Sequence, residues 1–249
     1  MDAEVAQRLI ALNKEFYQKL ASPFSATRSN LQPGVKRFLS DMPLDASILD
    51  LGCGNGGVAF ELVNRNHRGR YVGMDFSEEL LKVARSNVQS PMSKHPESKI
   101  QFIQSDLTSS DWNLQSPIFT LRFDFIFAFA ILHHIPSRSV RLGFLKQVHS
   151  LLATGGLFVL SNWQFLNSPR LKERIQPWET IGLSDKHVDY GDYLLDWRYG
   201  GHGLRYVHHF DEAELAGMAK ETGFRIVEEF LSDGKSGNLA LYQSWAAES

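Results

Sequence analysis

Apolar and polar residues alternate in blocks between residues 47 and 163, where short apolar runs are separated by longer segments with apolar residues at helical spacing. Such short runs predict buried strands, and the segments between them predict amphipathic helices. Because strands that alternate with helices form βαβ units, this stretch predicts a largely parallel sheet. We expect strands at 47–51, 71–75, 100–104, 123–129 and 157–162, and helices at 58–66, 78–89 and 138–152.

The pattern changes after the last of these strands. Gly155-Gly156 is expected to end the third helix. A short helix is expected at 211–222, followed by strands at 224–231 and 237–245, and residues 232–236 between them read as a hairpin loop. The sequence therefore predicts an α/β fold with a seven-stranded, mostly parallel sheet, an antiparallel hairpin at its C-terminal end, and helices on both faces.

The length of 249 residues fits one α/β domain with additions at its edges. We expect a single domain over 1–249, with an N-terminal helical cap at 1–40 and an insertion at 164–205 on the substrate side of the sheet. The cap begins with a charged amphipathic helix. The insertion is rich in Trp, Tyr, Gly and charged residues, and is expected to lie over the carboxyl edge of the sheet.

Composition narrows the classes of partner. The formal net charge of -2 provides no global basic field, so RNA binding would depend on a local patch or a partner subunit, and DNA is not expected. Cys53 is the single cysteine, which excludes disulfides within the chain and favours a reducing, cytoplasmic location. The first residues lack a signal-peptide core, and no apolar run approaches the roughly 20 residues that span a bilayer.

A glycine-rich turn follows the first strand, in the order Asp50-Leu51-Gly52-Cys53-Gly54-Asn55-Gly56-Gly57. Three of its glycines match a dinucleotide-binding pattern, and Asp75 lies where the ribose-binding acid of that pattern is expected. Asp50 distinguishes the alternatives, because a carboxylate at the mouth of the loop would repel a pyrophosphate. The same carboxylate suits S-adenosylmethionine, which carries a sulfonium and an amino group. We therefore predict a methyl-donor site.

Ligands of open α/β sheets lie at the carboxyl ends of the strands, and acidic residues follow three successive strands here. Asp75 can accept from both ribose hydroxyls, and Asp106 from the adenine amino group. The alternative for a single Asp is a helix or turn cap, and the alternative of a nucleophilic Cys53 is less favoured than a small side chain in a tight turn. The expected cofactor-binding residues are Asp50, Gly52, Cys53, Gly54, Asp75, Phe76, Asp106, Leu107 and Phe129.

The fourth strand ends at the pair His133-His134, which is expected to line the gap between donor and acceptor. Histidine is the side chain best suited to proton transfer near neutral pH, so one imidazole is a candidate base or hydrogen-bonding group. The alternative is that both residues hold the loop and the following helix. We expect no metal site, because metal-binding histidines on a helix prefer i,i+4 spacing and no Cys or acid cluster accompanies this pair.

Several segments outside the donor motif carry a resemblance to one family. They are Phe16 to Arg28 (FYQKLASPFSATR), Asp50 to Gly56, Phe123-Asp124-Phe125, His133-His134, Arg205-Tyr206-Val207-His208-His209-Phe210 and Glu214-Leu215. In these residues the chain resembles the tRNA wobble-uridine carboxymethyl methyltransferases, including the domain fused to AlkB-type hydroxylases. This is a subgroup of the class I methyltransferases, which bind S-adenosylmethionine on a Rossmann-like seven-stranded sheet. The resemblance spans nearly the whole chain.

The resemblance implies formation of a methyl ester on a uridine carboxymethyl group in tRNA. Arg suits such a carboxylate because its planar fork can bind both oxygens. We expect Arg28, Arg198 and Arg205 to contact the acceptor, with Tyr17, Phe24 and Tyr206 as the pocket wall; Arg28 and Arg205 join the two histidines as candidate catalytic residues. The alternative for each arginine is a solvated surface charge. Some members of the family also work with a small zinc-binding activator subunit that lies along the sheet edge.

Other acceptors stay open at this point. The aromatic residues of the insertion can stack on an unpaired base or enclose a small metabolite. The alternatives are therefore a methyltransferase for a small-molecule carboxylate or hydroxyl, a non-catalytic subunit that binds S-adenosylmethionine, and a nicotinamide oxidoreductase.

Overall fold

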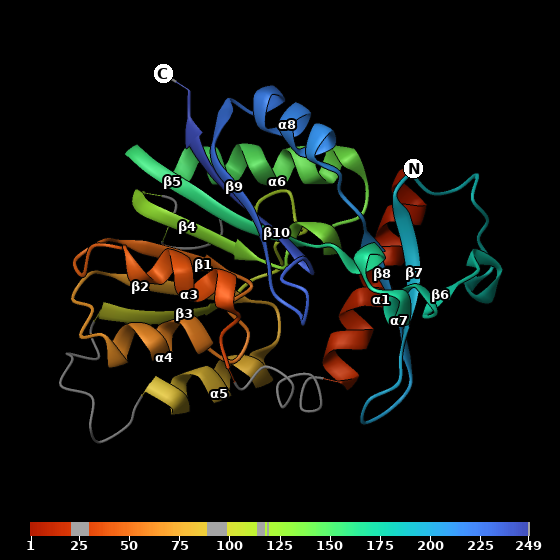
Figure 1. Ribbon diagram of the computed structural model, residues 1–249, viewed down its shortest axis with the longest axis horizontal. Helices are drawn as coiled ribbons and strands as arrows, with labels where there is room; N and C mark the ends of the chain where they lie inside the picture. Colours follow the sequence, from red (N-terminus) through yellow and green to blue (C-terminus); the bar gives the residue numbers. More distant parts are fainter. Residues whose placement is uncertain (21–29, 89–98, 114–117, 119, 249) are drawn as a thin grey trace.

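The computed structural model describes residues 1–20, 30–88, 99–113, 118 and 120–248. Within this part of the chain, a seven-stranded sheet has the order β3-β2-β1-β4-β5-β10-β9 (Figure 1). Its strands are β1 (Ile48–Leu51), β2 (Tyr71–Asp75), β3 (Ile100–Gln104), β4 (Phe123–Phe129), β5 (Leu152–Trp163), β9 (Phe224–Ser232) and β10 (Ala240–Ala247). The predicted fold class is confirmed.

The order of the strands places the glycine loop at the centre of the sheet. β1 pairs in parallel with β2 on one side and with β4 on the other, so Ile48 lies beside both Tyr71 and Phe125. From β1 the strand order continues outward on both sides, to β2 and β3 on one side and to β4 and β5 on the other. Open α/β sheets bind their ligands at such a change in strand order. β10 enters antiparallel between β5 and β9, as the predicted C-terminal hairpin requires.

Helices cover the two faces of this sheet. On one face α6 (Arg138–Leu151) and α8 (Glu212–Glu221) pack on alternate residues of the strands, around Leu49, Phe158 and Trp245. On the other face the apolar core is formed with α3 (Pro33–Ser40) and α4 (Gly57–Asn64), which lie next to α5 (Glu78–Val88). The burial of both faces explains why the strands read as nearly continuous apolar runs.

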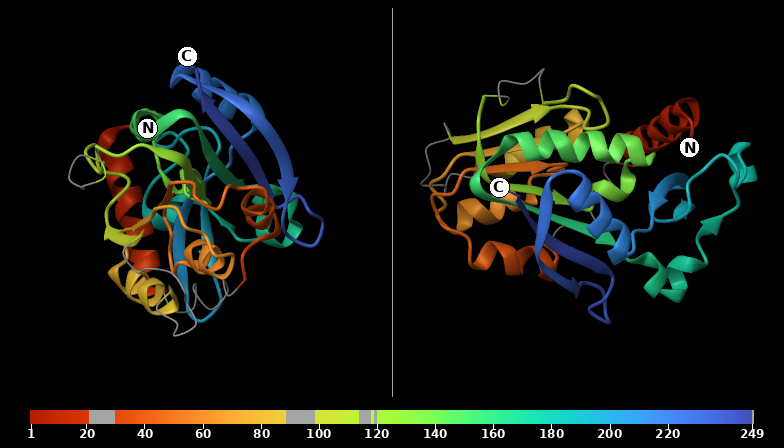
Figure 2. Two further views of the ribbon diagram at one scale, coloured as in Figure 1. Left: turned by 90° about the vertical axis from the view of Figure 1, so that its left-hand side faces the viewer. Right: turned by 90° about the horizontal axis from the view of Figure 1, so that it is seen from above.

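The insertion contains a second sheet that the sequence pattern did not predict. β6 (Ile175–Gln176), β7 (Asp192–Trp197) and β8 (Gly203–His208) form three antiparallel strands. The N-terminal helix α1 (Ala3–Lys19) packs on one face through Val5 and Leu9. In the right-hand panel of Figure 2, α1 and the insertion lie together at one end of the molecule. The short elements η2 (Leu132–His134), η3 (Phe165–Asn167), α7 (Pro169–Lys172) and η4 (Trp178–Ile181) complete the connections.

The largest difference in element boundaries is at β5. The strand begins at Leu152, directly after α6, and not at the predicted residue 157. Leu152 pairs with Phe123, and a register irregularity in this ladder lets the chain pass Gly155, which has a φ of +77°. Gly155-Gly156 therefore lies within a bulged strand and does not end the helix. The other predicted boundaries differ from the structure by up to three residues, as at β10.

Among the described residues, no helix has the length and apolar character needed to cross a membrane.

Candidate functional site

The glycine loop at the carboxyl end of β1 is held by main-chain hydrogen bonds. The N–H groups of Gly52 and Cys53 both donate to the Met74 carbonyl, at 2.7 and 3.0 Å. Gly52, Gly54 and Gly56 have φ values of +75°, +55° and +77°, which only glycine adopts at little cost. A Cβ on Gly52 would collide with the Ile131 side chain, whereas a Cβ on Gly54 would meet nothing within 4 Å. Gly54 therefore faces open space, where a ligand can approach the backbone.

Asp75, at the end of β2, accepts two main-chain hydrogen bonds. Gly54 N–H donates to its Oδ2 at 3.0 Å, and Ser77 N–H donates to its Oδ1 at 2.9 Å. Burial raises the pKa of this carboxyl. Three successive loop amides, from Gly52 to Gly54, thus already donate to protein oxygens. A loop that cradles pyrophosphate presents such amides to the ligand, so this arrangement fits a donor without phosphate groups.

Asp50 lies beneath the loop and not at its mouth, which corrects the position expected from the sequence. It is 3% exposed, and the Tyr71 hydroxyl donates to its Oδ2 at 2.6 Å. Burial raises the pKa of Asp50 to about 7, so a large share of this carboxyl is protonated near neutral pH. The exclusion of phosphate therefore depends more on the occupied loop amides than on the charge of Asp50.

Asp106, after β3, faces α1. Its Oδ1 accepts from the Thr108 N–H and hydroxyl, and its Oδ2 accepts from the Lys14 ammonium. Burial alone would raise the pKa of Asp106, but the hydrogen bonds from Lys14 and Thr108 outweigh it and the pKa lies below its usual value. The carboxylate is thus charged and oriented, as an acceptor for an adenine amino group must be. Lys14 was not anticipated from the sequence.

The other expected donor residues lie around the loop with different degrees of burial. Phe76 and Leu107 are partly exposed, so their side chains can cover a ligand. Cys53 is buried, and burial raises the pKa of its thiol well above the usual value, which fits a packing role. Phe129 packs against the rings of Phe127 and Tyr242, at centroid distances of 5.1 and 6.1 Å. The contact of these residues with S-adenosylmethionine stays a prediction.

His134 faces α1 and the insertion. Its Nδ1 lies 3.3 Å from the Tyr206 carbonyl oxygen, so this nitrogen donates there. In a neutral imidazole Nε2 then accepts, and the Tyr17 hydroxyl lies 2.7 Å from it. The Tyr17 ring also contacts Phe76 edge to face, at a centroid distance of 6.3 Å. The structure therefore brings together a predicted catalytic residue, a predicted pocket residue and a predicted cofactor residue.

His133 differs from its neighbour. Its side chain is 1% exposed, and its Nδ1 accepts from the Trp163 N–H at 3.3 Å. This contact joins the loop after β4 to the end of β5. The placement supports the alternative in which His133 holds the loop.

Arg205 lies in β8 among aromatic rings from three other elements. Its guanidinium carbon is 4.8 Å from the Trp163 ring centroid, 5.4 Å from Phe16 and 5.5 Å from Trp197. The side chain is 6% exposed. The ring faces attract the guanidinium through cation–π contacts. A guanidinium also matches the two oxygens of a carboxylate. This geometry suits recognition of a planar anion.

Tyr206 points to the opposite face of β8, into a buried network of charges. Its hydroxyl donates to Asp192 Oδ1 at 2.6 Å and accepts from Arg141 at 3.2 Å. His208 lies between Asp192 and Glu214, with Nδ1 and Nε2 at 2.6 and 2.9 Å from their oxygens. Tyr206 is fully buried, so this placement does not support its expected position in the pocket wall.

The remaining expected residues lie elsewhere. Arg198 is exposed and pairs with Asp196 at 2.7 Å. Phe24 and Arg28 fall outside the described residues. Among those that the structure describes, no group of three or more His, Cys, Asp or Glu side chains could hold a metal ion.

The network around His208 could have been found from the sequence with one further step. Residues two apart in a strand share a face, so a strand over 203–208 places Tyr206 and His208 together and Arg205 opposite. The helical spacing of Asn13 and Tyr17 likewise places both on one face of α1. Asn13 donates to the carbonyls of His134 and Tyr206, each at 3.1 Å. The sequence contains no local signal for the distant partners of these residues.

Comparison with known proteins gives a consistent result. A family model described as a methyltransferase domain matches residues 24–229. The tRNA (carboxymethyluridine(34)-5-O)-methyltransferase of Schizosaccharomyces pombe is 33% identical over 231 residues, which covers 86% of this chain and 89% of that protein.

Two solved structures show a similar fold. A SAM-dependent methyltransferase from Methanosarcina mazei is 22% identical with a TM-score of 0.65, and the match covers 88% of this chain and 98% of that one. The DhpI-SAM-HEP complex is 20% identical with a TM-score of 0.66, and covers 96% and 97% of the two chains.

Proposed function

Because this chain belongs to the S-adenosylmethionine-dependent methyltransferases, we propose that it methylates the carboxymethyl group of a modified wobble uridine in tRNA. The observation that carries the proposal is the guanidinium of Arg205, which lies among the rings of Phe16, Trp163 and Trp197. It lies in the strand whose Tyr206 carbonyl contacts His134, so an anion held there would lie near the histidine loop. The name of the relative from Schizosaccharomyces pombe supports the same acceptor.

A carboxylate acceptor needs little from the protein beyond positioning. With a pKa near ~4 it is ionised at pH 7, so no base has to remove a proton. S-adenosylmethionine supplies a methyl group on a positively charged sulfur, which leaves as a neutral thioether. Arg205 would donate hydrogen bonds to the carboxylate oxygens, and the surrounding rings would exclude water. Alignment of the acceptor oxygen with the methyl group then accounts for the rate.

The environment of His134 fits a carboxylate acceptor better than a hydroxyl acceptor. Methylation of a hydroxyl requires a base that accepts its proton. The Nδ1 of His134 donates to the Tyr206 carbonyl, and Nε2 contacts the Tyr17 hydroxyl. A histidine engaged at both nitrogens acts more readily as an orienting group than as a base. We infer that His134 and Tyr17 fix the floor of the acceptor site next to Phe76.

The test is methyl transfer from isotopically labelled S-adenosylmethionine to tRNA purified from cells that lack this protein, with nucleoside mass spectrometry of the product. We expect labelled carboxymethyluridine methyl ester with the wild-type protein. Arg205→Lys should lower kcat/KM for tRNA, because an ammonium cannot replace a planar fork, while the affinity for S-adenosylhomocysteine stays unchanged.

Unlabelled tRNA would overturn the proposal, provided that calorimetry shows the same protein preparation binding S-adenosylhomocysteine. Label recovered in a small carboxylic acid would instead identify a metabolite as the acceptor.

A further inference from the structure

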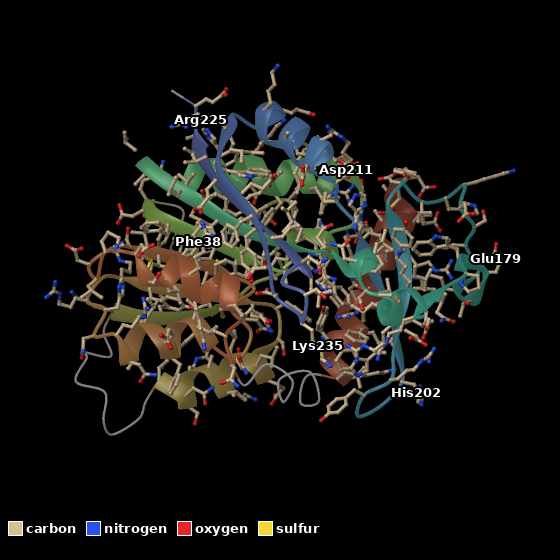
Figure 3. All side chains as sticks on the ribbon, viewed as in Figure 1. Phe38, Glu179, His202, Asp211, Arg225 and Lys235 are labelled. Atoms are coloured by element: carbon tan, nitrogen blue, oxygen red, sulfur yellow. The ribbon has the colours of Figure 1, made fainter. Side chains whose placement is uncertain are left out.

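The β7–β8 hairpin ends in an exposed tip, residues 198–202, between Trp197 and Gly203. Gly200 and Gly201 reverse the chain with φ values of +65° and +150°. The tip packs against the C-terminal end of α1, because Gly201 lies close to Leu20, and Gly203 lies close to both Phe16 and Leu20. Figure 3 labels His202 at this tip, which is the end of the hairpin away from Asp211. In Figure 1 the tip lies beside the C-terminal end of α1.

The ring of Trp197 connects this tip to Arg205. One contact of Trp197 is the Arg205 guanidinium at 5.5 Å, and another is the Tyr199 ring at a centroid distance of 6.4 Å with an interplanar angle of 90°. The indole N–H of Trp197 also donates to the Tyr199 carbonyl. Tyr199 is 58% exposed, although Trp197 is buried. Trp197 thus connects the buried Arg205 guanidinium to the Tyr199 ring, which is exposed to solvent.

The residues beside Tyr199 carry nitrogen donors. Arg198 is exposed and pairs with Asp196, and His202 is exposed on the other side of the glycines. Single-stranded RNA is bound by aromatic rings that stack on bases, together with cations that follow the phosphates. With a net charge of -2, an RNA contact made by this chain alone depends on such a local arrangement.

We propose that Tyr199 stacks on the nucleotide next to the uridine that is methylated, with Arg198 and His202 beside the adjoining phosphates. This assignment rests on the function proposed above. The hairpin tip then binds the single-stranded loop, whereas Arg205 binds the carboxymethyl group of the modified base.

The experiment measures the affinity of the wild-type protein, bound to S-adenosylhomocysteine, for a fluorescent anticodon stem-loop that carries carboxymethyluridine. Two further stem-loops have an abasic residue on the 5′ or the 3′ side of that uridine. Tyr199→Ala should weaken binding of the intact stem-loop by about 5- to 150-fold, the range observed for loss of one stacked base. Tyr199→Trp should retain the affinity, because stacking needs only an aromatic face.

The abasic stem-loops make the test specific. One of the two abasic stem-loops should bind the wild-type protein as weakly as the intact stem-loop binds Tyr199→Ala. In Tyr199→Ala, the same abasic residue should not weaken binding further. Tyr190→Ala is the matched control, since Tyr190 is 98% exposed and precedes β7 at the opposite end of the hairpin. It should leave the affinity unchanged.

Different results overturn different statements. Equal affinity of the wild-type protein and Tyr199→Ala for the intact stem-loop would overturn the stacking role while methyl transfer to tRNA stands. Additive effects of the variant and both abasic residues would also overturn it. A wild-type protein that neither binds nor methylates the stem-loop would remove the proposed function, and this inference with it.

Discussion

The proposed donor and acceptor halves of the site are built in opposite ways. In the donor half, Asp50 lies within a strand, Asp75 ends the next one and Asp106 follows the third, all in one mostly parallel sheet, and the loop is held by main-chain groups close to it. In the acceptor half, side chains from α1, β5, β7 and β8 meet, and Asn13 bonds Tyr206 across 193 residues. The donor half therefore depends on local chain geometry, and the acceptor half on long-range packing.

This difference explains what the sequence could predict. Glycines with positive φ and acids at strand ends leave a local signature, so the order of strands and helices and the glycine loop beside Asp75 could be predicted without the structure. Their role in donor binding stays a prediction. The strands of the insertion were not, because their apolar residues face α1 and η3 and show no clear alternation. The buried position of Tyr206 follows from that missed strand. The extension of β5 to Leu152 was missed because Gly155-Gly156 also fits a helix end.

The largest expected effect comes from a substitution in the donor half alone. Asp75→Ala removes the carboxylate expected to accept both ribose hydroxyls, and hydrogen bonds to charged groups contribute about 1.5–3 kcal/mol each. We expect the affinity for S-adenosylhomocysteine, measured by calorimetry, to fall by more than about 100-fold. Glu79→Ala, on the exposed side of α5, is the control. An Asp75 variant with unchanged affinity would show that ribose binds elsewhere.

The second effect concerns the acceptor half and its pH dependence. Burial alone would lower the pKa of His208, but its hydrogen bonds to Asp192 and Glu214 raise it above the usual value. A protonated His208 and Arg141 together balance these two carboxylates. A raised folded-state pKa means that this stabilisation is complete below the unfolded pKa of about 6.5 and is lost as pH rises through the folded pKa.

His208→Gln should therefore lower the free energy of unfolding by about 1.5–3 kcal/mol at pH 6, and by less at pH 9. Urea unfolding at both pH values measures the difference from the wild-type protein. The affinity for S-adenosylhomocysteine should not change, because the network does not touch the donor loop. His187→Gln, at an exposed position, serves as the control. A difference that is constant with pH would contradict a protonated His208.

The smallest effect tests the contact that joins the two halves. Lys14 of α1 pairs with Asp106, and both side chains are 37% exposed, so the pair contributes about 0.2–1 kcal/mol. Lys14→Met should weaken S-adenosylhomocysteine binding about 2- to 5-fold, since it releases the carboxylate expected to receive the adenine. Lys19→Met breaks the exposed pair with Glu15 on the same helix and should have no effect on calorimetric affinity. Equal losses in both variants would point to helix stability instead.

The helices α1 and α3 obtain part of their contacts late in the chain. Gly34 N–H, at the start of α3, donates to Asp233 at 3.1 Å, 199 residues away, and α1 packs on strands that end at His208. During synthesis on the ribosome, both helices emerge before some of the segments that cover their apolar faces, which include Tyr206 for α1 and Tyr242 for α3. The nascent chain must therefore carry exposed hydrophobic surface until its last quarter is made, which makes it a natural client for chaperones.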